Sequence, residues 1–156
     1  MKKFPKKTML AAGLAAAALI GGCDRAPPDG AVRVGKAWVR LPAAKGQPGS
    51  AYFTLEAGSE GTRLVGISSP LVRRVELHES RMEGDVARMD RKKEMEFPYD
   101  GKLEFEPGGR HAMLFGLHAS VKPGTRLPLT FAFNVAPPVT VDAEVRSLAD
   151  EGTHAH

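Results

Sequence analysis

The segment GGRHAMLFGL, residues 108–117, places a histidine and a methionine two positions apart, His111 and Met113. If the segment is a β-strand, these two side chains share a face and lie about 7 Å apart along it. An imidazole and a thioether could then bind one metal ion between them. The pattern alone is weak, because methionine is common in protein cores and a partly buried histidine usually bonds to a backbone group. Core packing therefore stays open as an alternative.

A second histidine and a second methionine occur upstream, in RVELHESRMEGDVARMD, residues 74–90. Two strand-like runs flank a turn in this segment. A two-residue turn at Glu83 and Gly84 would set His78 directly opposite Met89, with Cβ atoms about 5 Å apart; another turn register would break this pairing. If the two His-Met pairs meet in the folded chain, they form a site of two imidazoles and two thioethers.

This combination of ligands favours Cu(I). Thioethers are soft, neutral ligands and imidazole accepts the same ion, whereas Mg²⁺ and Ca²⁺ prefer oxygen ligands. Zinc sites use cysteine, histidine and carboxylate ligands, so methionines argue against zinc. In an oxidising compartment a thioether also keeps its affinity for Cu(I) without the disulfide exchange that a thiol undergoes.

Three more residues are candidate secondary metal ligands. Met82 lies near the expected turn, about 13 Å along the strand from His78, and is interpreted as a relay residue. His154 and His156 form a His-x-His sequence close to the C-terminus, which could bind Cu(II) weakly. A solvated tail that binds no metal is the alternative for these two residues.

The first residues of the chain resemble an export signal, with four lysines followed by an apolar run from Met9 to Ile20. This run is too short to span a bilayer, which takes about 20 residues. It ends at Ile20-Gly21-Gly22-Cys23, which resembles the lipobox of bacterial lipoproteins. Residues 1–22 are therefore predicted to be a lipoprotein signal peptide and Cys23, the only cysteine, a lipidation site. A free thiol beside an ordinary signal-peptidase site is the alternative.

These features predict a periplasmic protein that a lipid anchors to a membrane. Asp24 follows the cysteine, and in proteins with a similar lipobox an aspartate there favours the inner membrane. Four of the 22 lysines and arginines lie in residues 1–22 and none of the 18 acidic residues does. The rest of the chain thus has no formal net charge, and its composition does not indicate binding to nucleic acid.

The chain after the signal predicts one all-β domain. Residues 23–31 hold the lipidated cysteine and a Pro-rich tether, and residues 148–156 are expected to be a disordered, histidine-containing tail. Between them, residues 32–147 contain eight or nine short runs rich in Val, Phe, Leu and Thr, bounded by Gly and Pro clusters. Such runs without a helical period favour an antiparallel sandwich or barrel.

The four candidate ligands also carry a family resemblance. The spacing His-x10-Met-x21-His-x-Met, with flanking sequences such as AWVRLP, VELHE and EFEPGGRHAMLFGL, resembles the PCu(A)C family of periplasmic copper chaperones. The resemblance covers about Val32 to Val145. It implies a single-domain, cupredoxin-like Greek-key β-sandwich that binds Cu(I) through His78, Met89, His111 and Met113. It also implies that a monomer passes the copper to a partner, either the CuA subunit of cytochrome c oxidase or a Sco-like assembly factor.

Other classes of function fit the residues less well. No nucleophile stands in a recognisable motif, and by alternation Glu79 and Asp90 point away from His78, so the protein is not expected to be an enzyme. A blue-copper electron carrier needs a cysteine ligand beside two histidines, whereas Cys23 lies at the membrane end. A membrane-tethered structural or copper-buffering module without a delivery role remains the alternative to a chaperone.

Overall fold

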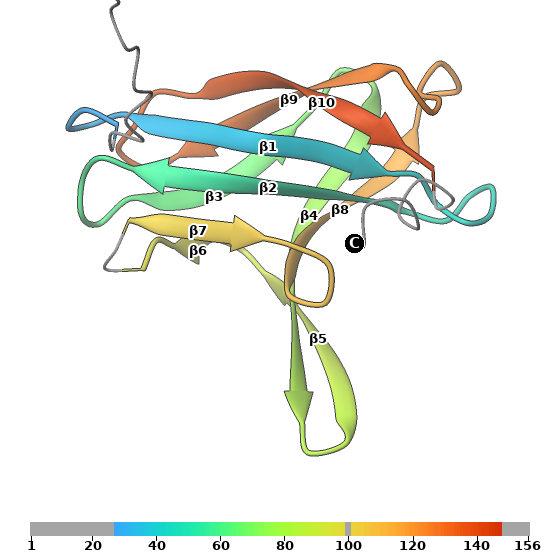
Figure 1. Ribbon diagram of the computed structural model, residues 1–156, viewed down its shortest axis with the longest axis horizontal. Helices are drawn as coiled ribbons and strands as arrows, with labels where there is room; N and C mark the ends of the chain where they lie inside the picture. The colour runs from blue at the N-terminus through green and yellow to red at the C-terminus, as the bar shows by residue number, and fades with distance from the viewer. Residues whose placement is uncertain (1–26, 99–100, 148–156) are drawn as a thin grey trace, which may run out of the picture.

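The computed structural model describes residues 27–98 and 101–147, which form ten β-strands (Figure 1). The strands are β1 (Val32–Arg40), β2 (Gly49–Ala57), β3 (Arg63–Ser68), β4 (Val72–Glu83), β5 (Val86–Lys92), β6 (Met95–Glu96), β7 (Lys102–Phe105), β8 (Arg110–Leu117), β9 (Arg126–Phe133) and β10 (Val139–Arg146). The predicted all-β class is confirmed. Each run expected from the sequence contains a strand, and the two-residue β6 is the one described strand that the pattern did not indicate.

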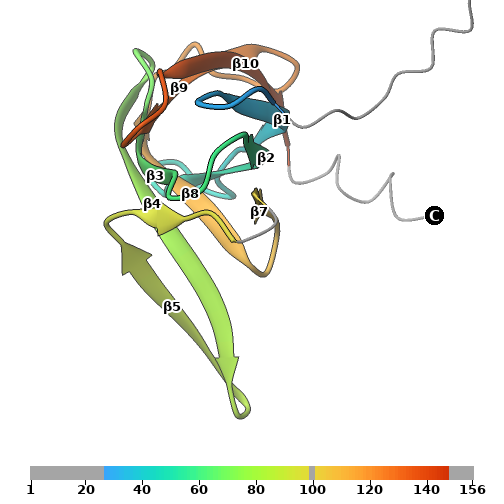
Figure 2. The same cartoon turned by 90° about the vertical axis from the view of Figure 1, so that its left-hand side faces the viewer.

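The strands join into one continuous sheet in the order β5-β4-β8-β2-β1-β10-β9-β3-β6, with β7 paired to β2. Only β1 and β10 pair in parallel among these neighbours; the other pairs are antiparallel. The sheet curls over on itself, so that its two halves face each other across a shared interior (Figure 2). This arrangement is the sandwich-like single domain that the alternating pattern predicted.

Aromatic side chains from both halves of the sheet meet in the core. The ring of Phe53 on β2 stacks on Phe105 at 4.2 Å between centroids and meets the ring of Phe131 on β9 edge-on at 4.8 Å. All three are at most 3% exposed. Since full burial of such a side chain contributes about 1.5–3 kcal/mol, these contacts hold the two halves of the sheet together.

The central strands β4, β8 and β2 have one face in this core. Leu77, Ala112 and Ala51 lie side by side on these three strands and are at most 4% exposed. Because successive side chains of a strand point to opposite faces, the residues next to them point to the outer face of the same strands. His78 and His111 are among these neighbours.

Strands β4 and β5 extend beyond the rest of the sheet as a long hairpin (Figures 1 and 2). Its turn is at Gly84 and Asp85, not at Glu83 and Gly84 as the sequence suggested, because Glu83 pairs with Val86. Gly84 has φ +64°, and a two-residue hairpin turn with glycine at its first central position uses this conformation.

The predicted pairing of His78 with Met89 is therefore wrong. Met89 lies opposite Ser80, and His78 lies opposite Arg91. Since the register differs from the prediction by two residues, and the side-chain period of a strand is two, Met89 stays on the same face of the hairpin as His78.

Several predictions fall outside the described residues. They concern the signal peptide, Cys23 and residues 24–26 of the tether at the N-terminus, and the predicted disordered tail of residues 148–156, with His154 and His156, at the C-terminus. Within the described ranges, no helix is long and apolar enough to span a membrane.

Candidate metal centre

Strands β4 and β8 bring the two candidate histidines together on the outer face of the sheet. Three successive cross-strand pairs share this face: His78 with His111, Glu76 with Met113, and Arg74 with Phe115. The rings of the two histidines are nearly parallel, with an angle of 22° between them and 5.8 Å between their centroids. The histidines thus meet as direct neighbours within one sheet.

One ring nitrogen of His111 is engaged by the turn that precedes β8. Nδ1 lies 3.1 Å from the carbonyl oxygen of Gly109, an acceptor only, so the ring donates through Nδ1–H. This tautomer leaves the lone pair of Nε2 available. The residue is 8% exposed. Backbone carbonyls commonly fix metal-binding histidines in this way.

His78 is fixed by a carboxylate. Its Nε2 lies 3.1 Å from Oε2 of Glu76, so Nε2–H donates to that oxygen. The other oxygen of the carboxylate is 3.1 Å from Nε of Arg74 and 3.5 Å from Nη1 of Arg91. Nδ1 of His78 is buried and has no hydrogen-bond partner among the described residues. Buried polar atoms are rarely left unpaired, and a lone pair in this position suits a metal ion.

The two methionines lie on opposite sides of the histidine pair. Met113 is partly buried, two residues after His111 and opposite Ser50 of β2. Met89 is 54% exposed and diagonal to His78, a position about 7–8 Å away. Met89 on β5 and Met113 on β8 are two strand spacings apart across the sheet, about 10 Å, and four residue positions apart along the strands, about 13 Å. This conformation places His78, His111 and Met113 on adjacent positions of one face and leaves Met89 apart from them.

The other methionines and the other histidine that the structure describes lie away from this cluster. Met82 is 67% exposed and lies further out on the hairpin, on the same face as His78. Met95 is 6% exposed and packs in the core. His118 follows β8 and is exposed, with its Nδ1 accepting a hydrogen bond from the backbone of Ser120.

The charges at the site are set by its hydrogen bonds and its burial. The hydrogen bond from His78 lowers the pKa of the Glu76 carboxyl, and the nearby guanidinium groups of Arg74 and Arg91 lower it further against the effect of burial. Burial lowers the pKa of His111, although its hydrogen bond to Gly109 opposes this effect. At neutral pH the site therefore has an ionised carboxylate beside His78 and an uncharged His111.

The sequence pattern alone did not indicate a role for Glu76 at the site. The available signal was its position two residues before His78, because residues two apart on a strand share a face. The side chain of Glu76 is 9% exposed, so it is an integral part of the site.

Comparisons with known proteins agree with this architecture. Residues 32–145 match the family described as "Putative lipoprotein LpqE-like". The chain is 31% identical to "Putative lipoprotein Lxx21020" of Leifsonia xyli subsp. xyli (strain CTCB07), over 77% of this chain and 74% of that protein.

Two solved structures share the fold. One is described as "Copper-bound PCuAC domain from PmoF2", with a TM-score of 0.64 and 23% identity, covering 79% of this chain and 98% of that domain. The other is the solution structure of CuI-DR1885 from Deinococcus radiodurans, with a TM-score of 0.55 and 26% identity over 81% of this chain and 83% of that one.

Proposed function

Since the chain belongs to the LpqE-like lipoprotein family, we propose that it is a copper chaperone that binds Cu(I) as cargo and passes it to a partner protein. Its fold is that of PCuAC domains, which confirms the resemblance found in the sequence. The proposed ligands are His78, Met89, His111 and Met113.

The observation that carries this proposal is the state of the two imidazoles. Each ring uses one nitrogen in a hydrogen bond to an oxygen, His78 to Glu76 and His111 to Gly109. The other nitrogen of each ring is then available as a neutral donor, and that of His78 is buried without a partner. Beside this pair lies the thioether of Met113, a donor suited to Cu(I).

Copper transfer on this site requires an exchange of ligands. Met89 is the most exposed of the four proposed ligands and lies on the projecting hairpin. Its thioether can leave the ion while a partner's thiolate or imidazole enters, with His78, His111 and Met113 still holding the copper. The exposed position of Met89 favours delivery over simple storage.

The cellular setting extends the proposal. The sequence of residues 1–23 and the lipoprotein names of the related proteins support export and a lipid anchor. We assign the protein to the periplasmic side of the inner membrane, where the recipient is the CuA subunit of cytochrome c oxidase or a Sco-like factor. His154 and His156 are proposed to offer a weaker, secondary Cu(II) site.

An anaerobic Cu(I) competition titration tests the proposed function. The chain from Asp24 to His156 is compared with the double variant His111→Ala/Met113→Leu, and the matched control is His118→Ala/Met95→Leu. One tightly bound Cu(I) in the parent and in the control, and its loss in the double variant, is the expected result. If the double variant binds Cu(I) as tightly as the parent, the copper is bound elsewhere. If the parent binds no Cu(I), the protein is a structural module instead of a chaperone.

Replacing Glu76 with glutamine is expected to weaken Cu(I) binding about tenfold, within the range for lost partners of metal ligands. The amide can donate as well as accept, so it no longer fixes the ring of His78 through Nε2–H. The measurements are Cu(I) affinity and the tautomer of His78 by ¹⁵N NMR. Glu79→Gln is the control, because Glu79 pairs with Lys92 and Arg110 on the other face. An unchanged tautomer in Glu76→Gln contradicts this role.

Acidification is expected to weaken Cu(I) binding less than two ordinary histidines would. A histidine must be neutral to bind the ion, and two with a pKa of about 6.5 would lower the affinity about a hundredfold between pH 7.5 and 5.5. Because burial lowers the pKa of His111, its ring stays neutral to lower pH and the loss is smaller. Competition titrations across this range measure it, and an affinity that does not change with pH contradicts ligation by histidine.

A further inference from the structure

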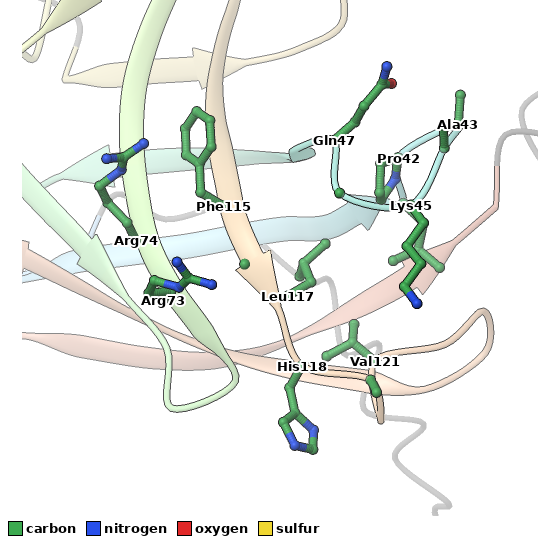
Figure 3. A pocket seen from close by; sticks show the side chains of 15 residues that line it. Pro42, Ala43, Lys45, Gln47, Arg73, Arg74, Phe115, Leu117, His118 and Val121 are labelled. Atoms are coloured by element: carbon green, nitrogen blue, oxygen red, sulfur yellow. The ribbon is translucent and has the colours of Figure 1, made fainter.

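A groove of about 910 Å³ opens beside the metal centre, at the end of β8 (Figure 3). The loop of residues 41–47 lies on one side of it and the start of β4 on the other. Its apolar part includes Leu41, Phe115 and Leu117, and Figure 3 shows the side chains of Arg73 and Arg74 on the β4 side. The proposed copper site gives this groove no role.

The groove is positively charged. Lys45, Arg73 and Arg74 line it, and no aspartate or glutamate is among its lining residues. Arg74 is already engaged, with its guanidinium 4.5 Å from the centre of the Phe115 ring and its Nε 3.1 Å from Glu76. Arg73 and Lys45 form no ion pair with any residue that the structure describes. Since the chain beyond residue 22 has no formal net charge, this is a local concentration of unpaired positive charge over apolar side chains.

The groove is continuous with the proposed copper ligands. Arg74 and Phe115 form the cross-strand pair next to Glu76 and Met113, and successive pairs on one face are about 7 Å apart. A molecule bound over Phe115 would therefore lie beside the thioether of Met113. Arg74 belongs to both places, because its one side chain covers Phe115 and pairs with Glu76.

We propose that this groove docks an acidic, partly apolar segment of the protein that receives the copper. The proposal rests on the proposed function and names the recipient's contact chemistry. Carboxylates of the recipient pair with Arg73 and Lys45, and an apolar side chain packs between Leu41 and Phe115. The recipient's metal ligands are thereby held next to Met113, and the opposite charges speed the encounter.

The position of the groove favours a protein over lipid headgroups. The described chain enters β1 at Val32, and the groove loop follows the other end of that strand, after Arg40. Nine residues of strand separate the two ends by about 30 Å. A tether that leaves from the start of β1 therefore keeps the groove at the end of the sheet away from the anchor.

Docking is tested first without copper, on the chain from Asp24 to His156. The probe is the blocked peptide Glu-Leu-Asp-Phe-Glu, its control is Gln-Leu-Asn-Phe-Gln, and ¹⁵N NMR follows the amides of the groove. We expect the acidic peptide, and not the neutral one, to shift the amides of residues 41–47 and 115–121. These shifts should be lost in the groove variant Arg73→Gln/Lys45→Gln and kept in the control variant Lys36→Gln/Lys93→Gln. Equal binding of the neutral peptide, retention in the groove variant, or stronger binding to phosphatidylglycerol vesicles overturns the proposal.

Transfer is tested second, with each peptide extended by Gly-Cys-Gly-Gly-Cys as the Cu(I) acceptor. The parent chain is expected to transfer copper about tenfold faster to the acidic acceptor than to the neutral one, within the range for charge steering. In Arg73→Gln/Lys45→Gln the two rates become equal, while the Cu(I) affinity is unchanged. Equal rates in the parent overturn the proposal. A failure of the copper function shows instead as a parent that binds no Cu(I), a result that leaves the peptide shifts measurable.

Discussion

Replacing Met113 with leucine is expected to lower the affinity for Cu(I) at least about a hundredfold while the sheet stays folded. Removing only an outer partner of a metal ligand already weakens binding about 10–100-fold, and this substitution removes a proposed ligand itself. Leucine nearly conserves the volume of methionine, so the effect on stability should stay below about 1.5 kcal/mol. Anaerobic competition measures the affinity, and thermal unfolding measures the stability.

Three comparisons test the specificity of this effect. Met95→Leu makes the same change at a core position and should leave the affinity unchanged. Met89→Leu should weaken binding less than Met113→Leu, because Met89 is 54% exposed and lies diagonal to His78 instead of beside the histidine pair. Cu(II), which depends less on thioethers, should lose little affinity in Met113→Leu. Parent-like Cu(I) affinity in Met113→Leu would remove this residue from the site.

The sequence predicted the strands well because their signal is local. Alternating apolar residues and turn-forming glycines mark each of the longer strands, and the same alternation placed His111 and Met113 on one face. The two-residue strand β6 has too few residues to show a period. No local pattern therefore indicated its pairing with β3, in which Met95 lies opposite Leu64.

The hairpin shows what a local pattern cannot fix. The residues Glu83-Gly84-Asp85 allow a two-residue turn either at Glu83-Gly84 or at Gly84-Asp85. In the structure the turn is at Gly84-Asp85, and Gly84 has the positive φ of its first central position. The direct His78–Met89 contact was therefore wrong. The predicted face was still correct, since a shift of two residues keeps a side chain on its face.

The meeting of His78 and His111 depends on long-range pairing. Strands β4 and β8 are separated in the sequence by β5, β6 and β7, so no local pattern sets their register. The local patterns left open whether the two His-Met pairs meet, and the family resemblance was what implied that the two histidines belong to one site. The structure adds what the resemblance did not contain, the hydrogen bonds that the two rings donate to Glu76 and Gly109, which determine which nitrogen of each ring is available.

Replacing Leu114 with alanine is expected to destabilise the protein by about 2–5 kcal/mol, as for other buried leucines. Leu114 is fully buried and lies between Met113 and Phe115 on β8, with its side chain on the core face. Loss of its packing should lower the Tm by about 10 °C or more. Thermal and denaturant unfolding of the copper-free chain measure this change. Val135→Ala is the control, because Val135 is 63% exposed and should change stability by less than about 0.5 kcal/mol.

Copper should restore part of this lost stability, because an ion that binds only the folded state stabilises it by mass action, about 2.7 kcal/mol at a hundred times its Kd. The Cu(I) affinity of folded Leu114→Ala should stay near that of the parent, since Leu114 faces the core and Met113 points to the outer face with the proposed metal site. Leu114→Ala and Met113→Leu thus separate the two faces of β8. Leu114→Ala lowers the stability and keeps the proposed site, whereas Met113→Leu keeps the stability and disrupts the proposed site. A large loss of affinity in folded Leu114→Ala would instead mean that core packing sets the ligand geometry.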